Sequence, residues 1–275
     1  MKALFLALLI LLSLPTLSQQ LPPGVVGDYT PGTAKDAQYG VLVLGGAEGG
    51  KPTALARMFI DQGYPVLSLA YFKTAPLPAE LENIPLEYFA TAIKWLAQQA
   101  PGKHKGVLIV GWSKGAELAL LLASRYPAVK GVVAISPSSV VWAGILKDWK
   151  KTPGSSWTAH GQPLSFVPFK SESATSLLTL YANSLNNEPA AAAATIPLEQ
   201  SKAAVLLLSG SQDAVWPAAL MSEQLMARLK AANYSRSYSH LNYPELGHLL
   251  NEKFLSATPE HPSRSAILSF LGSVE

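Results

Sequence analysis

Residues 106–125, GVLIVGWSKGAELALLLASR, decide the fold of this chain. The stretch contains an apolar run (106–110), the pentapeptide GWSKG (111–115) and a run of good helix formers (116–125). A strand, a tight turn with a serine between two glycines, and a helix are typical of a nucleophile elbow. The strained turn lifts the serine hydroxyl clear of the sheet, and the glycines avoid collisions between strand and helix. The pattern therefore predicts that Ser113 is a nucleophile.

A serine nucleophile needs a carboxylate to orient its base, and two aspartates follow Ser113 in the chain. In the fold that carries this elbow the partners follow in the order Ser, acid, His. Asp148 lies in LKDWKK, which is typical of an exposed helix end. Asp213 ends AAVLLLSGSQD, an apolar strand followed by a loop, so its carboxylate is expected at the sheet edge where catalytic groups gather. We expect Asp213 to be the acid, although a cap on the next helix would explain it equally simply.

Three histidines follow Asp213 and are candidates for the base. His248 lies in YPELGHLLN, a loop signal after the alternating segment 236–242, and this order requires the histidine after the last strand. His240 falls within the alternation and is expected on a strand face. His261 precedes a proline at the expected start of the final helix. We predict that His248 is the base; the alternative is a surface loop residue.

Two backbone N–H groups are needed to bind the oxyanion that forms during acyl transfer. Lys114 supplies one by its position after the nucleophile. The glycine-rich loop GGAEGG (45–50) follows an early apolar strand and should supply the other, from Gly46 or Ala47. A phosphate-binding glycine loop is the alternative, but its characteristic spacings are absent.

Apolar strands alternate with amphipathic helices along most of the chain. This alternation predicts an α/β fold of the α/β-hydrolase type, with a mostly parallel central sheet and helices on both faces. The expected strands are 39–44, 65–71, 106–110, 131–136 and 203–209, and the expected helices are near 53–62, 86–99, 116–125, 217–231 and 263–271.

The length of 275 residues favours one large domain, which we place at residues 39–275. Residues 19–38 lack periodicity and are interpreted as an irregular lead-in. The alternation stops over residues 137–201, which contain Trp142, Trp157 and a polyalanine run. This segment is either a surface insertion or a cap over the serine that supplies an apolar wall for an acyl group; we favour the cap.

Residues 1–18 have the features of a secretory signal peptide: Lys2, an apolar run over 3–14, and the pattern Thr16, Leu17, Ser18 at the expected cleavage site. The run is short for a permanent span, so we expect no stable membrane span after cleavage, with an uncleaved anchor as the alternative. The chain has no cysteine. Export without disulfides favours the bacterial periplasm.

The charge pattern argues against several classes of function. A formal net charge of +3 is too small and too dispersed for a nucleic-acid partner. Lys150 and Lys151 are interpreted as a solvated helix end, and Lys114 with Glu117 as a surface ion pair. The histidines are scattered and form no metal motif, so we expect no metal and no cofactor.

The chain resembles the C-terminal catalytic domain of the acyl-CoA thioesterase / bile acid-CoA:amino acid N-acyltransferase family, a dienelactone-hydrolase-like branch of the α/β-hydrolases. The resemblance runs from about residue 39 to the end of the chain, and SKGAEL together with AYF and IPLEYF is much more specific than G-x-S-x-G. The similar segments, in order, are LVLGGAEGG, PVLSLAYF, IPLEYFATAIKWL, GWSKGAELAL, AISPSSVVWAG, SSWTAHGQPLSFVPF and IPLEQSKAAVLLLSGSQDAVWPA.

The resemblance implies Ser113 as nucleophile, Asp213 as acid and His248 as base, the same residues that chain order selects. It also implies acyl transfer from a small-molecule ester or thioester through an acyl-serine. The N-acyltransferase branch commonly has cysteine at the elbow, so serine favours hydrolysis. The alternatives are an acyltransferase with an amine or alcohol acceptor, and a non-catalytic module that binds a ligand in the apolar cavity.

Overall fold

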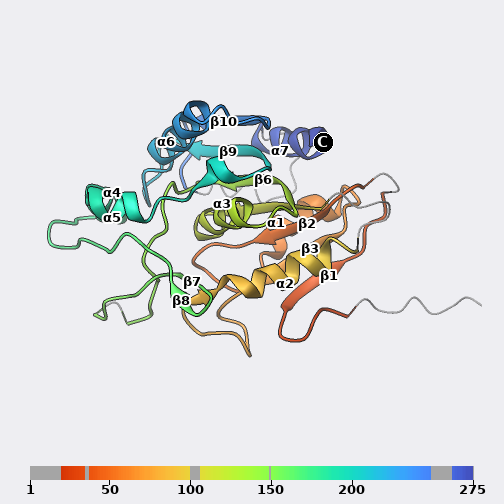
Figure 1. Ribbon diagram of the computed structural model, residues 1–275, viewed down its shortest axis with the longest axis horizontal. Coiled ribbons are helices and arrows are strands. Elements are labelled where there is room, and N and C mark those ends of the chain that lie inside the picture. The colour runs from red at the N-terminus through yellow and green to blue at the C-terminus, as the bar shows by residue number, and fades with distance from the viewer. Residues whose placement is uncertain (1–19, 35–36, 100–105, 149, 249–261, 275) are drawn as a thin grey trace, which may run out of the picture.

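The elbow strand lies in the middle of a seven-stranded sheet (Figure 1). The computed structural model describes residues 20–34, 37–99, 106–148, 150–248 and 262–274. The strand order is β1-β3-β2-β5-β6-β9-β10, and every neighbouring pair is parallel except β1 with β3. The strands are β1 (Val26–Thr30), β2 (Gly40–Leu44), β3 (Val66–Ala70), β5 (Val107–Trp112), β6 (Val129–Ile135), β9 (Ala204–Gly210) and β10 (Tyr238–Tyr243).

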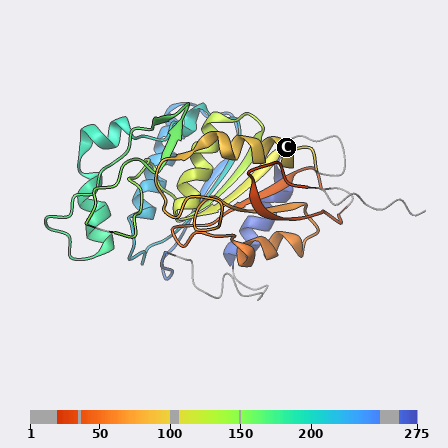
Figure 2. The same cartoon turned by 90° about the horizontal axis from the view of Figure 1, so that it is seen from below.

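Helices cover both faces of the sheet, and the strand sequences explain why. Val41 and Val43 pack into one buried cluster, whereas Leu42 and Leu44 pack into another, because successive side chains on a strand point to opposite faces. The first cluster includes α1 (Thr53–Ile60) and α7 (Pro262–Ser273); the second includes α2 (Leu86–Leu96), α3 (Lys114–Arg125) and α6 (Ala218–Ala231) (Figure 2). The prediction of an α/β-hydrolase fold with a mostly parallel sheet is confirmed.

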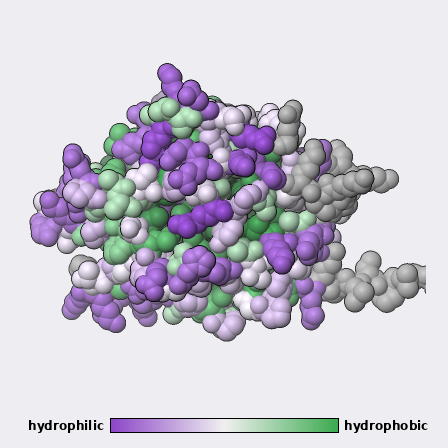
Figure 3. All heavy atoms as spheres, viewed as in Figure 1, coloured by the Kyte–Doolittle hydropathy of each residue, from purple (hydrophilic) through white to green (hydrophobic). Residues whose placement is uncertain are grey.

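The predicted insertion leaves the central sheet after β6 and returns to it at β9. It lies on one side of the molecule (Figure 1), and Trp142 and Trp157 within it are completely buried. Figure 3 shows apolar residues at the surface among polar ones on this side. Its elements are β7 (Trp157–Ala159), β8 (Gln162–Pro163), α4 (Leu177–Leu185), α5 (Glu188–Ala193) and the 3-10 helix η1 (Leu198–Gln200), and β7 pairs with the short β4 (Ile84–Pro85) outside the insertion.

The interpretation of residues 19–38 as irregular is wrong in part. Val26–Thr30 form β1, which pairs antiparallel with β3 at the edge of the sheet. None of its five residues is buried and it contains a glycine, so the apolar run that marks the other strands is missing. Its pairing is set by backbone hydrogen bonds to β3 and by the Tyr88 hydroxyl, which accepts a hydrogen bond from the Val26 N–H group at 3.1 Å.

Two expectations fall outside the described residues: the signal peptide at 1–18 and the position of His261. Within the residues that the structure does describe, no helix is long and apolar enough to cross a membrane.

Candidate functional site

Ser113 occupies a strained turn between β5 and α3. Its φ of 53° and ψ of −123° lie in a region that side chains rarely adopt. A Cβ atom at Gly111 would lie 2.1 Å from the Gly115 carbonyl oxygen, and one at Gly115 would lie 2.3 Å from the Gly45 carbonyl oxygen. Both glycines are therefore required by backbone contacts, as the motif predicted. The Ser113 N–H group donates a hydrogen bond to Ile135 O at 2.8 Å, which fixes the turn against β6.

The imidazole of His248 joins Ser113 to Asp213. His248 Nε2 lies 2.8 Å from Ser113 Oγ, and His248 Nδ1 lies 2.8 Å from Asp213 Oδ2. An ionised carboxylate can only accept, so Nδ1 carries a proton, and in the neutral imidazole Nε2 is then free to accept from the serine hydroxyl. His248 thus meets Ser113, 135 positions before it, and Asp213, 35 positions before it, at the carboxyl edge of the sheet.

The Asp213 carboxylate is fixed by the turn that follows β9. Its Oδ1 accepts hydrogen bonds from the N–H groups of Val215 at 2.8 Å and Trp216 at 3.1 Å. The helix-cap alternative is wrong, because the N-cap of α6 is Pro217 and no side chain caps that helix. Oδ1 instead closes the turn before the helix, while Oδ2 remains available to His248. The side chain is only 4% exposed, so little water competes for either bond.

Ser136 and Trp216 hold His248, and sequence reasoning missed both. The Ser136 hydroxyl donates a hydrogen bond to the main-chain carbonyl of His248. The Trp216 ring lies edge-on to the imidazole with centroids 5.5 Å apart, and its indole N–H donates to Ser136 O at 3.2 Å. Ser136 itself has a φ of 49°, an unusual conformation for a serine directly after β6. This strained backbone is not readable from the sequence.

Of the two predicted loop donors, only Ala47 has an N–H group without a hydrogen bond in the described part of the chain. The Gly46 N–H group donates to Glu48 Oε1 at 2.7 Å and is therefore occupied. Ala47 lines the same cavity as Ser113 and Lys114, and its N–H group makes no hydrogen bond to the described part of the chain. The hydrogen bonds therefore favour Ala47 over Gly46 as the second oxyanion donor, a choice that the sequence left open.

Side chains from β5 and from the segment that follows β3 hold this loop against the elbow. Trp112 Nε1 donates to Glu48 Oε1 at 3.1 Å, and the Tyr71 hydroxyl donates to Gly45 O at 2.6 Å. Lys73 Nζ donates to Ala47 O at 3.1 Å. Burial raises the pKa of Tyr71 well above its ordinary value, with Glu48 and Glu117 adding to the shift, so the phenol stays protonated and remains a donor.

The prediction that Lys114 and Glu117 form a surface pair is wrong. Lys114 Nζ lies 2.6 Å from Glu117 Oε2, but the two side chains are 1% and 0% exposed. Glu117 Oε1 accepts from the Trp157 indole N–H at 2.7 Å and from the Trp142 N–H at 3.2 Å. Burial lowers the pKa of Lys114 and raises that of Glu117, and their mutual attraction opposes both shifts. The insertion covers a pair that a bare helix would have left exposed.

A cavity of about 570 Å³ opens beside Ser113. Its walls are mostly apolar and come largely from the predicted insertion, joined by the loop before α6. The residues that line it are Ala47, Ser113, Lys114, Gly144, Ile145, Leu146, Lys150, Lys151, Thr152, Pro153, Pro168, Phe169, Ser171, Leu177, Leu180, Tyr181, Val215 and Trp216.

Lys150 and Lys151 do not form a helix end as predicted. Both are exposed and lie outside any helix, and both line the cavity beside Ser113. No aspartate or glutamate is among the described residues of that wall. The rim of an otherwise apolar cavity is therefore cationic.

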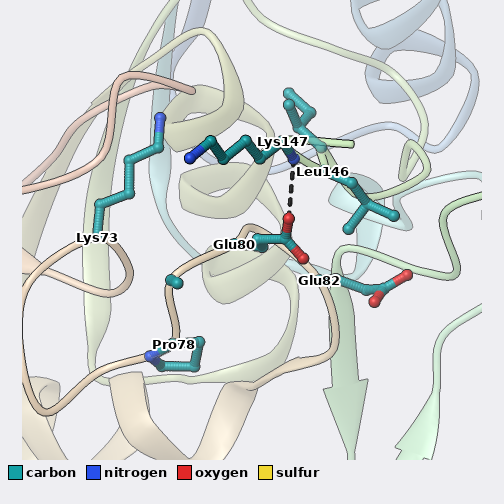
Figure 4. A pocket seen from close by; sticks show the side chains of 8 residues that line it. Lys73, Pro78, Glu80, Glu82, Leu146 and Lys147 are labelled. Atoms are coloured by element: carbon teal, nitrogen blue, oxygen red, sulfur yellow. Dashed lines mark hydrogen bonds between the residues drawn. The ribbon is translucent and has the colours of Figure 1, made fainter. Parts of the chain in front are cut away.

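A second cavity of about 610 Å³ adjoins the first and shares Ile145 and Leu146 with it. Figure 4 shows Lys73 and Lys147 extending toward one end of this cavity. Glu80 accepts a hydrogen bond from the Lys147 N–H at 2.9 Å (Figure 4). The cavity does not contain Ser113, Asp213 or His248 in its wall.

The remaining candidates lie apart from this cluster. His240 sits on β10, as expected, and its Nε2 lies 2.7 Å from the buried Ser209 hydroxyl. Asp148 is exposed in a bend. Among the residues that the structure describes, no three histidine, aspartate or glutamate side chains lie close enough to hold a metal ion.

Comparison with known proteins identifies the family. The family model described as BAAT / Acyl-CoA thioester hydrolase C terminal matches residues 84–265. The chain belongs to this family. The matched segment contains Ser113, Asp213 and His248.

The curated relatives extend well beyond the segment that they share with this chain. Acyl-coenzyme A thioesterase 5 of Mus musculus is 28% identical over 220 residues, which are 78% of this chain and 50% of the relative. Acyl-coenzyme A amino acid N-acyltransferase 1 of Mus musculus is 28% identical over 238 residues, which are 85% of this chain and 51% of the relative. The chain therefore spans about half the length of these relatives.

Solved structures share the fold of this family member. A putative dienelactone hydrolase from Klebsiella pneumoniae has a TM-score of 0.53 at 17% identity, covering 90% of this chain and 99% of that one. An esterase from Pyrococcus furiosus has a TM-score of 0.57 at 14% identity, covering 91% and 92%. At such identities the likeness shows the α/β-hydrolase fold alone.

Proposed function

We propose that the protein is a serine hydrolase that cleaves an acyl ester or thioester through an acyl-serine intermediate. One observation carries this proposal: His248 bridges Ser113 and Asp213 with two 2.8 Å contacts. The order Ser, acid, His and the strained elbow support it, and so does membership in a family whose description names acyl-CoA thioester hydrolases.

In the first half of the reaction Ser113 Oγ attacks the acyl carbonyl carbon. His248 Nε2 takes the hydroxyl proton, and Asp213 stabilises the imidazolium. The bond from the carbonyl carbon to the leaving oxygen or sulfur then breaks, and His248 gives its proton to that atom. The alcohol or thiol departs, and the acyl group stays on Ser113.

Water completes the reaction by the same route. It attacks the acyl-serine carbonyl while His248 Nε2 accepts one of its protons, and the proton returns to Ser113 Oγ as the serine ester bond breaks. The carboxylic acid leaves, and the enzyme is restored. In both halves the N–H groups of Lys114 and Ala47 bind the oxyanion. The Gly46 N–H is not available for this, because it donates to Glu48 Oε1.

The cavity beside Ser113 would hold the acyl group, with the insertion acting as a cap. Its apolar wall favours a hydrocarbon chain, because burying each methylene is worth about 0.8 kcal/mol. The cationic rim at Lys150 and Lys151 would face the leaving group. A CoA thioester carries phosphates and suits such a rim, so CoA thioesters and simple esters are both candidate substrates.

The proposal is tested by measuring hydrolysis of p-nitrophenyl esters and CoA thioesters over a series of acyl lengths. We expect turnover of at least one series, abolished by Ser113→Ala and reduced at least about 10³-fold by His248→Ala. Full activity in the folded Ser113→Ala variant would contradict the mechanism. Ligand binding without any turnover would favour a non-catalytic module instead.

Acyl transfer is the second candidate, because one relative is named as an acyl-coenzyme A amino acid N-acyltransferase. The same acyl-serine would then be attacked by an amine or alcohol instead of water. Product ratios with and without glycine, taurine or glycerol distinguish the two. An amide or a new ester as the main product would establish transfer.

We also propose that the protein is exported, most simply to a bacterial periplasm, on the strength of Lys2 and the apolar run at 3–14. Expression of the full chain in a bacterial host, followed by fractionation and N-terminal sequencing, tests this. A processed N-terminus near residue 19 in the periplasmic fraction is the expected result. An unprocessed protein confined to the cytoplasm would contradict export.

A further inference from the structure

Tyr181 brings a polar group into the apolar part of the cavity beside Ser113. It lies on α4 of the insertion and lines the cavity together with Phe169, Leu180 and Trp216. Helix α4 has a well-defined start, since Ser176 and Thr179 form a capping box there. The position of Tyr181 is therefore determined by a regular element and not by a loose loop.

Three aromatic rings fix the orientation of the Tyr181 ring. Trp142, Phe169 and Trp216 each meet it edge to face, with centroid distances of 4.8, 5.3 and 5.4 Å and interplanar angles of 86–90°. Trp216 in turn contacts the imidazole of His248. Tyr181 thus lies one ring away from the proposed base, in a rigid setting.

The hydroxyl of Tyr181 makes no hydrogen bond within the part of the chain that the structure describes. Only 5% of the residue is exposed, and the residue forms part of the cavity wall. The Tyr181 hydroxyl oxygen is not among the fully buried side-chain atoms that lack a hydrogen-bond partner, so it is open to the cavity that Tyr181 lines. Tyr88 and Tyr234, which are less buried, both hydrogen-bond to main-chain carbonyls. The missing partner of Tyr181 is consistent with a group on a bound ligand.

This hydroxyl can act only as a neutral group at ordinary pH. Burial raises the pKa of Tyr181 far above its usual value, and the nearby Glu117 carboxylate adds to the shift. A neutral phenol is a good donor, and the wall around it offers apolar side chains from Leu180 and Phe169. A ligand oxygen that accepts a hydrogen bond would complete the site.

We propose that Tyr181 is a specificity-determining residue that donates a hydrogen bond to an oxygen on the acyl chain of the substrate. The natural acyl group is accordingly a mostly apolar chain that also carries an oxygen, such as a hydroxy-, oxo- or ether-substituted acid. The inference rests on the proposed function in one respect: the cavity is taken as the acyl site. A pocket that hydrogen-bonds a substrate oxygen discriminates against the analogue that lacks it, because its own polar group is then left unpaired.

The test compares p-nitrophenyl alkanoates with counterparts in which an ether oxygen replaces one methylene at successive positions. An ether oxygen only accepts, so it matches the phenol without adding a donor. Binding is measured by calorimetry in the Ser113→Ala background, with and without Tyr181→Phe, and kcat/KM is measured with Ser113 present. At one position we expect Tyr181→Phe to lower the preference for the ether over the all-carbon ester about tenfold.

Tyr29→Phe is the matched control, because this tyrosine lines neither cavity and also lacks a hydrogen bond in the described chain. It should leave the preference unchanged. An unchanged preference with Tyr181→Phe at every position would overturn the inference, as would failure of the Ser113→Ala protein to bind either ester. Tyr181-dependent binding without turnover by the wild type would instead contradict the proposed hydrolysis and leave this inference standing.

Discussion

Lys114 Nζ lies 2.6 Å from Glu117 Oε2 with both side chains buried, immediately after the elbow serine in the chain. The carboxylate also accepts hydrogen bonds from Trp142 and Trp157 of the insertion. One buried carboxylate therefore ties the first turn of α3, whose Lys114 N–H is a proposed oxyanion donor, to the segment that walls the cavity. The relationship predicts a large and specific stability effect.

Lys114→Met should lower the free energy of unfolding by about 3–5 kcal/mol, because it leaves Glu117 charged and uncompensated in the interior. Adding Glu117→Gln should recover much of the loss, since glutamine removes the charge and can still accept from the Trp157 indole. Urea unfolding measures both. Arg57→Met is the control: Arg57 Nε lies 2.7 Å from Asp61 Oδ1 but is exposed, so less than about 1 kcal/mol is expected. Equal losses of unfolding free energy in Lys114→Met and Arg57→Met would contradict the claim that burial makes the Lys114 substitution more costly.

Glu48 should act as a positioning residue for the Ala47 N–H. Its carboxylate holds Gly46 and Trp112, so Glu48→Ala should lower kcat about tenfold with little change in KM, because the oxyanion exists only in the transition state. Glu48→Gln keeps an acceptor oxygen and should retain most of the activity. Glu80→Ala removes a carboxylate from the neighbouring cavity and serves as the control. If Glu48→Ala leaves kcat intact, the loop does not depend on this carboxylate.

Lys150 and Lys151 should favour substrates with an anionic leaving group. Replacing both by alanine is expected to lower kcat/KM about tenfold for a CoA thioester, and this loss should shrink at high ionic strength. The neutral p-nitrophenyl ester of the same acid should be unaffected. Alanine substitutions at Lys202 and Lys230, which line neither cavity, control for the change in net charge. Equal effects on both substrates would argue against a leaving-group site at this rim.

His240 should make stability depend on pH without affecting the proposed chemistry. Burial lowers the pKa of His240, so the folded state binds fewer protons here than the unfolded state does. The contribution of His240 to the free energy of unfolding is fully present above the ordinary histidine pKa of about 6.5. It is lost as the pH falls toward the lowered pKa of His240 in the folded state. The thermal midpoint of His240→Asn should therefore fall less than that of the wild type on acidification below about pH 6.5. If the thermal midpoints of the two proteins fall by the same amount with pH, this prediction is wrong.

The sequence predicted the central fold well because its signals are local. The apolar runs at Gly40–Leu44 and Val107–Trp112 form strands, and the spacing of GWSKG determines the turn between strand and helix. The order of Ser113, Asp213 and His248 could be read directly, because the carboxyl ends of parallel strands meet at one edge of the sheet.

What the sequence could not show depends on contacts between distant segments. Lys114 and Glu117 have the spacing of an exposed helical pair, and only the packing of Trp142 and Trp157 reveals that they are buried. β1 lacks an apolar run because it lies at the sheet edge. Ser136 acts through a residue 112 positions away, and no local pattern marks such a contact.

The central claim, that Ser113 is a nucleophile activated by His248, is tested most directly by covalent labelling. The folded wild-type protein is treated with a fluorophosphonate, and the mass of the peptide that contains Ser113 is measured. We predict one phosphonate adduct on Ser113, none with Ser113→Ala, and much slower labelling with His248→Ala at unchanged thermal stability. A wild-type protein that stays unlabelled, or a Ser113→Ala variant that is labelled as fast, would contradict the claim.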